Sequence, residues 1–330
     1  MNSSASPSND NSQTVQEAIV SDTKQVTVSV PRRYPPKGTA AALKKTKETT
    51  VVADPVEELT AQVAAVNLTE LAPVTISDAG PWGHILRQLK YTGHGELMVT
   101  ADEIKQCGKS WTGKASQFEP RLLSYQTSAN DRPDAFKSLG LYILPIKNGT
   151  YMLTKHNIYM SLDYACNRDP IVLKKDTSSL ILSMGQSETS LIDNLRYSGV
   201  FEHETLLGEP ISHGPLLNGR HRISMDMRLG TVPISIGGVQ YETDSCFESE
   251  HKILLIEGKS GAKEIDSFNI RQLYFPYRAI HECVGSRKEI LSIFVHQLGD
   301  TVHIWKYRFT DVLDMSSIEL GGHFTYRFSS

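Results

Sequence analysis

Cysteine is scarce in this sequence, and no two cysteines have a recognisable spacing. The 330 residues include only four, which are Cys107, Cys166, Cys246 and Cys283, and none of them forms the CxxC pair of a zinc or redox motif. The 11 histidines include no HExxH motif and no cluster with cysteine. The sequence therefore argues against a disulfide framework and against a zinc site, and we expect reduced thiols that serve as small apolar residues.

Long apolar segments are missing as well. Hydrophobic residues make up 39% of the chain, but no apolar run approaches the roughly 20 residues that span a bilayer. The polar N-terminal sequence MNSSASPSNDNSQ has no apolar core, so it does not resemble a secretory signal. We therefore expect a cytoplasmic protein without a membrane partner.

Positive charge is not in excess, and two common nucleotide and hydrolase motifs are incomplete or absent. Lys and Arg number 34 against 37 Asp and Glu, for a net charge of -3, so a nucleic-acid partner would need local basic surface. Gly258-Lys259-Ser260 and Gly108-Lys109-Ser110 resemble the end of a Walker A loop but lack its earlier glycine. No GxSxG elbow is present. These absences argue against ATP binding and against a serine hydrolase.

The chain divides into three regions by composition. Residues 1–75 are rich in Ser, Thr, Asn, Pro, Ala and Val and predict a flexible, partly basic arm, with a short helix near 55–65. Seven basic residues and no acidic residue lie between Asp22 and Glu48. Two interpretations stay open for this stretch, an arm that wraps phosphates and a solvated tail.

Residues 76–160 predict an α+β domain. Helices are expected over 83–91, over 99–107 with Thr100 as N-cap, and around 134–139. Strands over 141–146 and 150–153 flank the hairpin turn Lys147-Asn148-Gly149. Helices followed by a hairpin are typical of a DNA-reading winged helix and equally of an ordinary α+β subdomain.

Residues 161–330 predict an α/β domain with a mixed central sheet flanked by helices. We expect helices over 187–196 and 265–283, with Pro276 kinking or ending the second helix. The expected strands cover 222–228, 232–244, 253–257, 290–297 and 301–309. The continuous apolar run over 253–257 is typical of a buried central strand.

Charged residues follow two of these strands at the points where chemistry is expected. Glu257 and Lys259 are two apart on one strand and therefore share a face. Asp244 ends the preceding strand, and residues 247–252 are long enough for the reversal that lays the two strands side by side. Asp244 and Glu257 would then bind Mg²⁺ through hard oxygen ligands, while Lys259 polarises the attacking water or neutralises charge on a phosphate.

The arrangement Asp244…Glu257-Gly-Lys259 resembles the PD-(D/E)XK nuclease motif, with Thr243 at the position of its proline. The segments GVQYETD, LLIEGKSG and DSFNIRQLYFPYR further resemble bacterial type II restriction-endonuclease-like proteins. The similarity runs from about Trp82 to the C terminus. It implies a restriction-endonuclease-like core in which the two acids and the lysine are catalytic.

Further site residues are expected around this motif. The resemblance implies an additional helical acid, for which Glu188 and Glu202 are the candidates, and it places Gln272 facing the metal-bearing strands. Gln240 and Glu242 are expected to line the site, because they share a face of the strand with Asp244. Candidates for gripping the DNA backbone are Arg271 and Arg278, two helical turns apart, and Arg220 and Arg222 on either side of His221.

The function expected from these features is Mg²⁺-dependent hydrolysis of phosphodiester bonds at specific sites in double-stranded DNA. In restriction defence a cognate DNA methyltransferase would protect the host, and cutting both strands would favour a homodimer. Two alternatives stay open. One is a repair or structure-selective nuclease of the same fold, and the other is a DNA-binding regulatory protein on that scaffold that no longer cuts.

Overall fold

The computed structural model of the protein describes residues 75–76, 79–174 and 187–329. The basic stretch between Asp22 and Glu48 and the helix expected near 55–65 lie outside these residues. Contacts group Glu70–Ser330 into one compact unit.

The first part of the described chain consists of short helices and a small antiparallel sheet. Thr100 and Glu103 form the predicted capping box at the start of the second helix, with Glu103 N donating to Thr100 Oγ1 over 3.2 Å. Gly149 has a φ of +70° in the turn of the predicted hairpin. The elements are α2 (Pro81–Gln88), β1 (Leu97–Thr100), α3 (Ala101–Gly108), η1 (Ala115–Phe118), α4 (Pro120–Ser124), η2 (Ala129–Asp131), α5 (Asp134–Leu139), β2 (Tyr142–Lys147) and β3 (Thr150–Thr154).

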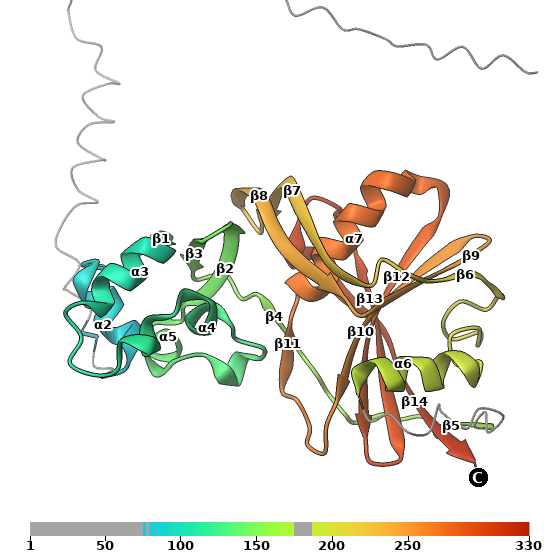
Figure 1. Ribbon diagram of the computed structural model, residues 1–330. Helices are drawn as coiled ribbons and strands as arrows, with labels where there is room; N and C mark the ends of the chain where they lie inside the picture. Colours follow the sequence, from blue (N-terminus) through green and yellow to red (C-terminus); the bar gives the residue numbers. More distant parts are fainter. Residues whose placement is uncertain (1–74, 77–78, 175–186, 330) are drawn as a thin grey trace, which may run out of the picture. The chain divides into compact units, whose positions relative to one another are not determined.

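The remaining elements build a seven-stranded sheet and a two-stranded sheet, and they add β7 and β8 to the small sheet of the first part (Figure 1). Ser187 caps the predicted helix α6 by accepting a hydrogen bond from Ser190 N. The elements are β4 (Tyr159–Ser161), β5 (Ile171–Lys174), α6 (Glu188–Tyr197), β6 (Ile211–Leu216), β7 (Gly219–Leu229), β8 (Val232–Thr243), β9 (Ser245–Ser249), β10 (Lys252–Ser260), β11 (Ser267–Asn269), α7 (Arg271–Val284), η4 (Gly285–Arg287), β12 (Glu289–Leu298), β13 (Thr301–Phe309), η5 (Met315–Ser317) and β14 (Ile318–Ser329).

The five-stranded sheet joins the two halves of the described chain. Its order is β1-β3-β2-β8-β7, and β2 meets β8 in parallel at the pair Lys147 and Gly237. Buried Leu144 and Met152 of this sheet belong to the same apolar core as Leu255 of β10 and Phe268 of β11. The hydrophobic core therefore continues from the first half of the chain into the second.

The seven-stranded sheet has the order β5-β14-β13-β12-β10-β9-β6. The interior strand β10 runs antiparallel to β9 and parallel to the central strand β12, to which α7 makes the crossover. Alternate residues of β10 face opposite sides, since Ile253 and Leu255 share a core with α7 whereas Leu254 and Ile256 share a core with α6. The sheet therefore carries a helix on each face, as an α/β protein does.

Several sequence predictions are corrected by the structure. The strand that pairs with β10 is β9, which follows Asp244, whereas β8 belongs to the other sheet. Of the two predicted effects of Pro276, an end of the helix is excluded because Pro276 lies inside α7, and a kink stays a prediction. Strand β11 precedes that helix, so the helix begins at Arg271 rather than near residue 265. The long strand β14 was not predicted, because Gly321, Gly322 and several polar residues interrupt its apolar pattern.

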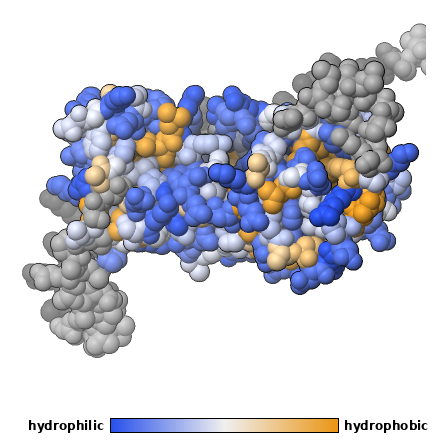
Figure 2. All heavy atoms as spheres, turned by 90° about the horizontal axis from the view of Figure 1, so that it is seen from below, coloured by the Kyte–Doolittle hydropathy of each residue, from blue (hydrophilic) through white to orange (hydrophobic). Residues whose placement is uncertain are grey.

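The described surface is largely polar on the face drawn in Figure 2, where apolar residues form separate patches. Among the described helices, none is both long enough and apolar enough to cross a bilayer. A few large apolar side chains are exposed, including Leu122, Tyr125 and Tyr197. Of these three, only Tyr125 lines the cavity described next.

Candidate active site

Asp244 lies where the chain leaves one sheet and enters the other. Strand β8 ends at Thr243 in the five-stranded sheet, and β9 begins at Ser245 in the seven-stranded sheet. The Asp244 Oδ2 atom accepts a hydrogen bond of 2.8 Å from the backbone N–H of Gly258. This bond fixes the carboxylate beside β10, between the two other residues of the predicted motif.

Glu257 is the one acidic residue of β10, and it is buried, with only 5% of its surface exposed. Its Oε1 atom accepts a hydrogen bond from Lys259 Nζ over 2.7 Å and another from Gln272 Nε2 of α7. Burial raises the pKa of Glu257 to about 8, although the Lys259 ammonium opposes this shift. The negative charge of Asp244 acts in the same direction as burial.

Lys259 is surrounded by oxygen atoms. Its Nζ atom donates to Glu257 Oε1 and, over 2.9 Å, to the Gly258 carbonyl, and it lies 3.3 Å from Glu188 Oε1. Burial by itself would lower the pKa of this ammonium, but the neighbouring Glu257, Asp244 and Glu188 carboxylates raise it above the ordinary value. Lys259 therefore carries a positive charge throughout the neutral pH range.

One cavity of about 730 Å³ brings most of the predicted residues together. Among the described residues, seven carboxylic acids line it but only two basic side chains, Lys259 and Arg271, so this lining is strongly acidic. The predicted residues that line it are Glu188, Gln240, Glu242, Asp244, Glu257, Lys259, Arg271 and Gln272. Residues from β8, β10, α6 and α7 therefore share a single site.

Arg271 is the first residue of α7 and lacks an ion-pair partner among the described residues. Its Nε atom is buried and makes no hydrogen bond within that part of the chain. Burial lowers the pKa of Arg271, while the charges of Tyr159 and Glu257 oppose the shift. The site thus contains a guanidinium that forms no close ion pair with a described carboxylate, although the charge of Glu257 acts on it.

The other three predicted arginines do not line the cavity. Arg220 forms an exposed ion pair with Glu242, and Arg222 donates to the Gly238 carbonyl over 2.8 Å. The remaining candidate for the helical acid, Glu202, pairs with Arg196 at 3.4 Å and does not line the cavity either.

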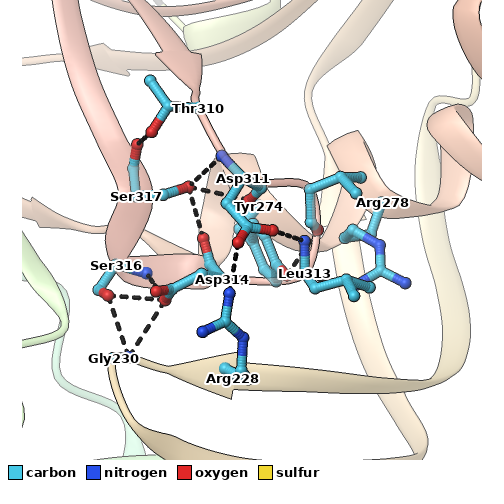
Figure 3. A network of polar contacts seen from close by, with 11 residues as sticks. Arg228, Gly230, Tyr274, Arg278, Thr310, Asp311, Leu313, Asp314, Ser316 and Ser317 are labelled. Atoms are coloured by element: carbon cyan, nitrogen blue, oxygen red, sulfur yellow. Dashed lines mark hydrogen bonds and ion pairs between the residues drawn. The ribbon is translucent and has the colours of Figure 1, made fainter.

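Arg278 is buried and forms its hydrogen bonds within the protein. It is 6% exposed, and its Nη1 atom lies 3.3 Å from both the Asp226 carbonyl of β7 and Tyr274 Oη. Tyr274 Oη in turn donates to the Val312 carbonyl over 3.0 Å. Figure 3 shows Arg278 and Tyr274 next to the polar loop that holds the turn between β7 and β8. Binding of Arg278 to the DNA backbone stays a prediction, and its contacts within the protein do not support it.

The turn itself is held by two aspartates of that loop. Asp311 pairs with Arg228, and Asp314 Oδ1 accepts a 3.1 Å hydrogen bond from Gly230 N (Figure 3). Hydrogen bonds from Ser316 help to lower the pKa of Asp314 against the opposing effect of burial. The β7–β8 hairpin is therefore anchored to the β13–β14 connection at the end opposite Asp244.

The sequence prediction missed one wall of the cavity. Residues from two segments line it, 125–131 before α5 and 264–268 around β11. These segments meet through a 2.8 Å hydrogen bond from Ala129 N to Ser267 Oγ, across 138 positions of the sequence. No local pattern marks such a contact, so the sequence offered no signal for this wall.

The donor atoms at the site fit a hard divalent cation. Asp244, Glu257 and the Gly258 carbonyl offer oxygen ligands of the kind that Mg²⁺ prefers, with water or substrate oxygens filling the remaining positions. Among the described residues, no three His, Cys, Asp or Glu side chains converge to bind a metal by themselves. Mg²⁺ binding by Asp244 and Glu257 therefore stays a prediction.

Comparison with known proteins gives two family matches. The model of a domain of unknown function, DUF6996, matches residues 81–153, and that of a second domain of unknown function, DUF6997, matches residues 154–327. Searches of the curated proteins and of the solved structures found no match. The second match includes β8, β10, α6 and α7, and it covers more than half of the chain. The chain belongs to the DUF6997 family.

Proposed function

We propose that this protein is a Mg²⁺-dependent DNA endonuclease whose active site contains Asp244, Glu257 and Lys259. The observation that carries the proposal is the hydrogen-bonded group at β10. The Asp244 carboxylate accepts a hydrogen bond from Gly258 N. On either side of Gly258 lie the buried acid Glu257 and Lys259, whose ammonium donates a hydrogen bond to Glu257. Because the three side chains come from the PD-(D/E)XK-like motif, this geometry supports that resemblance.

The protein groups divide the chemistry between them. Asp244 and Glu257 would hold the cation, which when bound supplies positive charge at the phosphate and lowers the pKa of a water ligand. Lys259 donates hydrogen bonds at the same place, so it would orient the attacking water or neutralise charge on the scissile phosphate. Gln272 holds the Glu257 carboxylate from α7.

The order of elements supports a restriction-endonuclease-like core. Helix α6 precedes the strands that lead to β10, and α7 then connects β10 to the parallel strand β12. In the first half, helices α2, α3 and α5 and the sheet order β1-β3-β2 support a winged-helix-like, DNA-reading domain. We propose restriction of foreign DNA in the cytoplasm as the physiological role, by a homodimer, with a cognate DNA methyltransferase protecting the host.

Cleavage of unmethylated plasmid and phage DNA tests the proposal. We expect discrete fragments with Mg²⁺, no cutting with EDTA, and no cutting by a Lys259→Ala variant. Lys263→Ala is the matched control, because Lys263 is exposed nearby and does not line the cavity. Salt-sensitive DNA binding without cutting in wild type would overturn the nuclease and favour the regulatory DNA-binding alternative. Cutting that depends on branches or lesions would favour the repair alternative.

A further inference from the structure

The segment 125–131 presents selected side chains to the cavity in a fixed conformation. Burial alternates along it, so that Gln126 and Ser128 point inward whereas Tyr125, Thr127 and Asn130 are exposed. Asp131 braces the segment internally by accepting hydrogen bonds from Thr127 Oγ1 and, over 2.9 Å, from Ser128 N. The orientation of the exposed side chains is therefore set by the buried ones.

Two further bonds attach this segment to the part of the chain that bears the acids. Tyr159 Oη donates to the Gln126 carbonyl over 3.0 Å, and Ala129 N donates to Ser267 Oγ over 2.8 Å. Ser267 belongs to β11, which leads directly into Arg271 and Gln272 at the start of α7. The wall is thus held against β11, the strand immediately before the helix that supplies Gln272 to Glu257.

Two groups of this cavity have no partner among the described residues, and the guanidinium of a third, Arg271, lies 5.8 Å from the centre of the Phe275 ring but forms no ion pair with a described residue. The Tyr125 side chain is 73% exposed and stacks on no described aromatic ring. The Asn130 amide makes no hydrogen bond to a described residue, and the buried Arg271 Nε atom lacks one as well. The pKa of Arg271 is lowered by burial, and it responds to charge on Tyr159, on Glu257 and on Tyr125. Arg271 is therefore close enough to sense both the wall and the catalytic acid.

The three groups suit the three parts of a nucleotide. An exposed aromatic ring stacks on a base, an amide binds a base edge, and a guanidinium binds a phosphate in a bidentate manner. The cavity volume lies within the roughly 300–1,000 Å³ of small-molecule sites. Bases inside a duplex are covered on both faces by their neighbours, so a ring can stack only on a base that has left the stack.

We propose that Tyr125, Asn130 and Arg271 form a subsite for one unstacked nucleotide of the DNA strand that is cut. The inference rests on the proposed nuclease function and specifies how the substrate enters the site. The base lies on Tyr125 with its edge toward Asn130, and its phosphate lies at Arg271. The nucleotide comes either from a single strand or from a base turned out of a duplex.

Binding of labelled oligonucleotides to full-length protein in EDTA tests the subsite apart from cleavage. The probes are a single strand, its perfect duplex and the same duplex with one mismatch, each with 2-aminopurine at the central position. We expect Tyr125→Ala to weaken binding of the single strand and the mismatched duplex about ten-fold and to abolish quenching of the base fluorescence. Tyr125→Phe keeps the aromatic face and should behave like wild type.

Tyr197→Ala is the matched control, because Tyr197 is 63% exposed on α6 and does not line the cavity. Equal binding of all probes by Tyr125→Ala and Tyr197→Ala would overturn the subsite, as would no binding by any protein. Parallel Mg²⁺-dependent cleavage keeps the two proposals distinguishable. If wild type cleaves DNA but Tyr125→Ala does not change binding, only the subsite is rejected. If Tyr125→Ala weakens binding but wild type does not cleave DNA, only the nuclease proposal is rejected. Tighter binding of the mismatched than of the perfect duplex identifies a turned-out base as the source.

Discussion

At the scale of single residues, the site combines one tethered acid, one buried acid and one lysine. Glu257 is almost fully buried, whereas the Lys259 side chain is 24% exposed, so the cost of removing charge from water falls mainly on the acid. The raised pKa of Glu257 follows from this difference. Such a shift is typical of functional sites, where the acid is placed for its chemistry rather than for stability.

Replacing Glu257 by Gln should stabilise the metal-free fold while abolishing cleavage. The neutral amide removes a carboxylate that burial and Asp244 disfavour, and the expected gain is on the order of 2 kcal/mol near neutral pH. Urea unfolding in EDTA measures the gain, and the plasmid assay measures the loss. A variant less stable than wild type would show that the contact with Lys259 outweighs the cost of burial.

The buried Arg278 illustrates how placement changes the expected effect of a substitution. Arg278→Ala should lower the free energy of unfolding by about 2–3 kcal/mol, because the Asp226 carbonyl and Tyr274 Oη lose a charged donor. The control Arg308→Ala removes an ion pair with Glu319 whose arginine side chain is 71% exposed, and should cost less than about 0.5 kcal/mol. Equal losses in chemical denaturation would contradict the structural role of Arg278.

At the scale of elements, neighbouring strands β12, β13 and β14 bring three histidines together. His303 Nδ1 lies 3.1 Å from His323 Nε2, and Tyr164 Oη lies 2.6 Å from His296 Nδ1. Burial, together with His323 and His296, lowers the pKa of His303 to about 4. The aromatic neighbours Tyr164 and Trp305 offer this ring no compensating negative charge.

The sheet should therefore lose stability in mildly acidic solution. Above the unfolded-state pKa of about 6.5, His303 is neutral in both states and costs nothing. As the pH falls from about 6.5 to about 4, the unfolded chain binds a proton that the folded chain does not, so folding weakens by on the order of 2 kcal/mol. Denaturation at several pH values across this window checks the loss, and His303→Gln should reduce its slope. An unchanged slope in that variant would assign the loss to other groups.

Elements defined by local spacing were predictable from the sequence, and elements defined by distant partners were not. The Thr100 cap and the turn at 147–149 each depend on residues within a few positions of one another. The pairing of β9 with β10 depends on which strand enters the seven-stranded sheet. Hydrophobic alternation along the strands does not specify that choice. Eight predicted residues line the cavity because strand periodicity and a motif locate them, whereas Tyr125 and Asn130 reach it only through tertiary contacts.

At the scale of the whole molecule, the apolar core crosses the border between the two family matches. Leu144, Ile146 and Met152 precede residue 154 and pack in the same core as Leu255 and Phe268. Strand β8 also borders β2 in the five-stranded sheet. The second matched region is therefore incomplete as a folding unit without the first.

A chain that begins at Thr154 should consequently be destabilised or unfolded. It would expose the core face of β8 and of the residues around β11, and we expect early cleavage in limited proteolysis and a lost or broadened thermal transition. Full-length protein under the same conditions is the reference. A cooperative transition at the same temperature in both chains would contradict a shared core.

The position of Asp244 between two sheets has a mechanical consequence. One acid of the site is carried by the end of β8, while the other lies on β10 in the neighbouring sheet. A twist of one sheet against the other would act on Asp244, which is held beside β10 both by the bond to Gly258 and, through the adjacent Ser245, by the pairing of β9 with β10. Strain applied at β1, β2 or β3 would therefore reach, through β8, the residue that connects the two sheets.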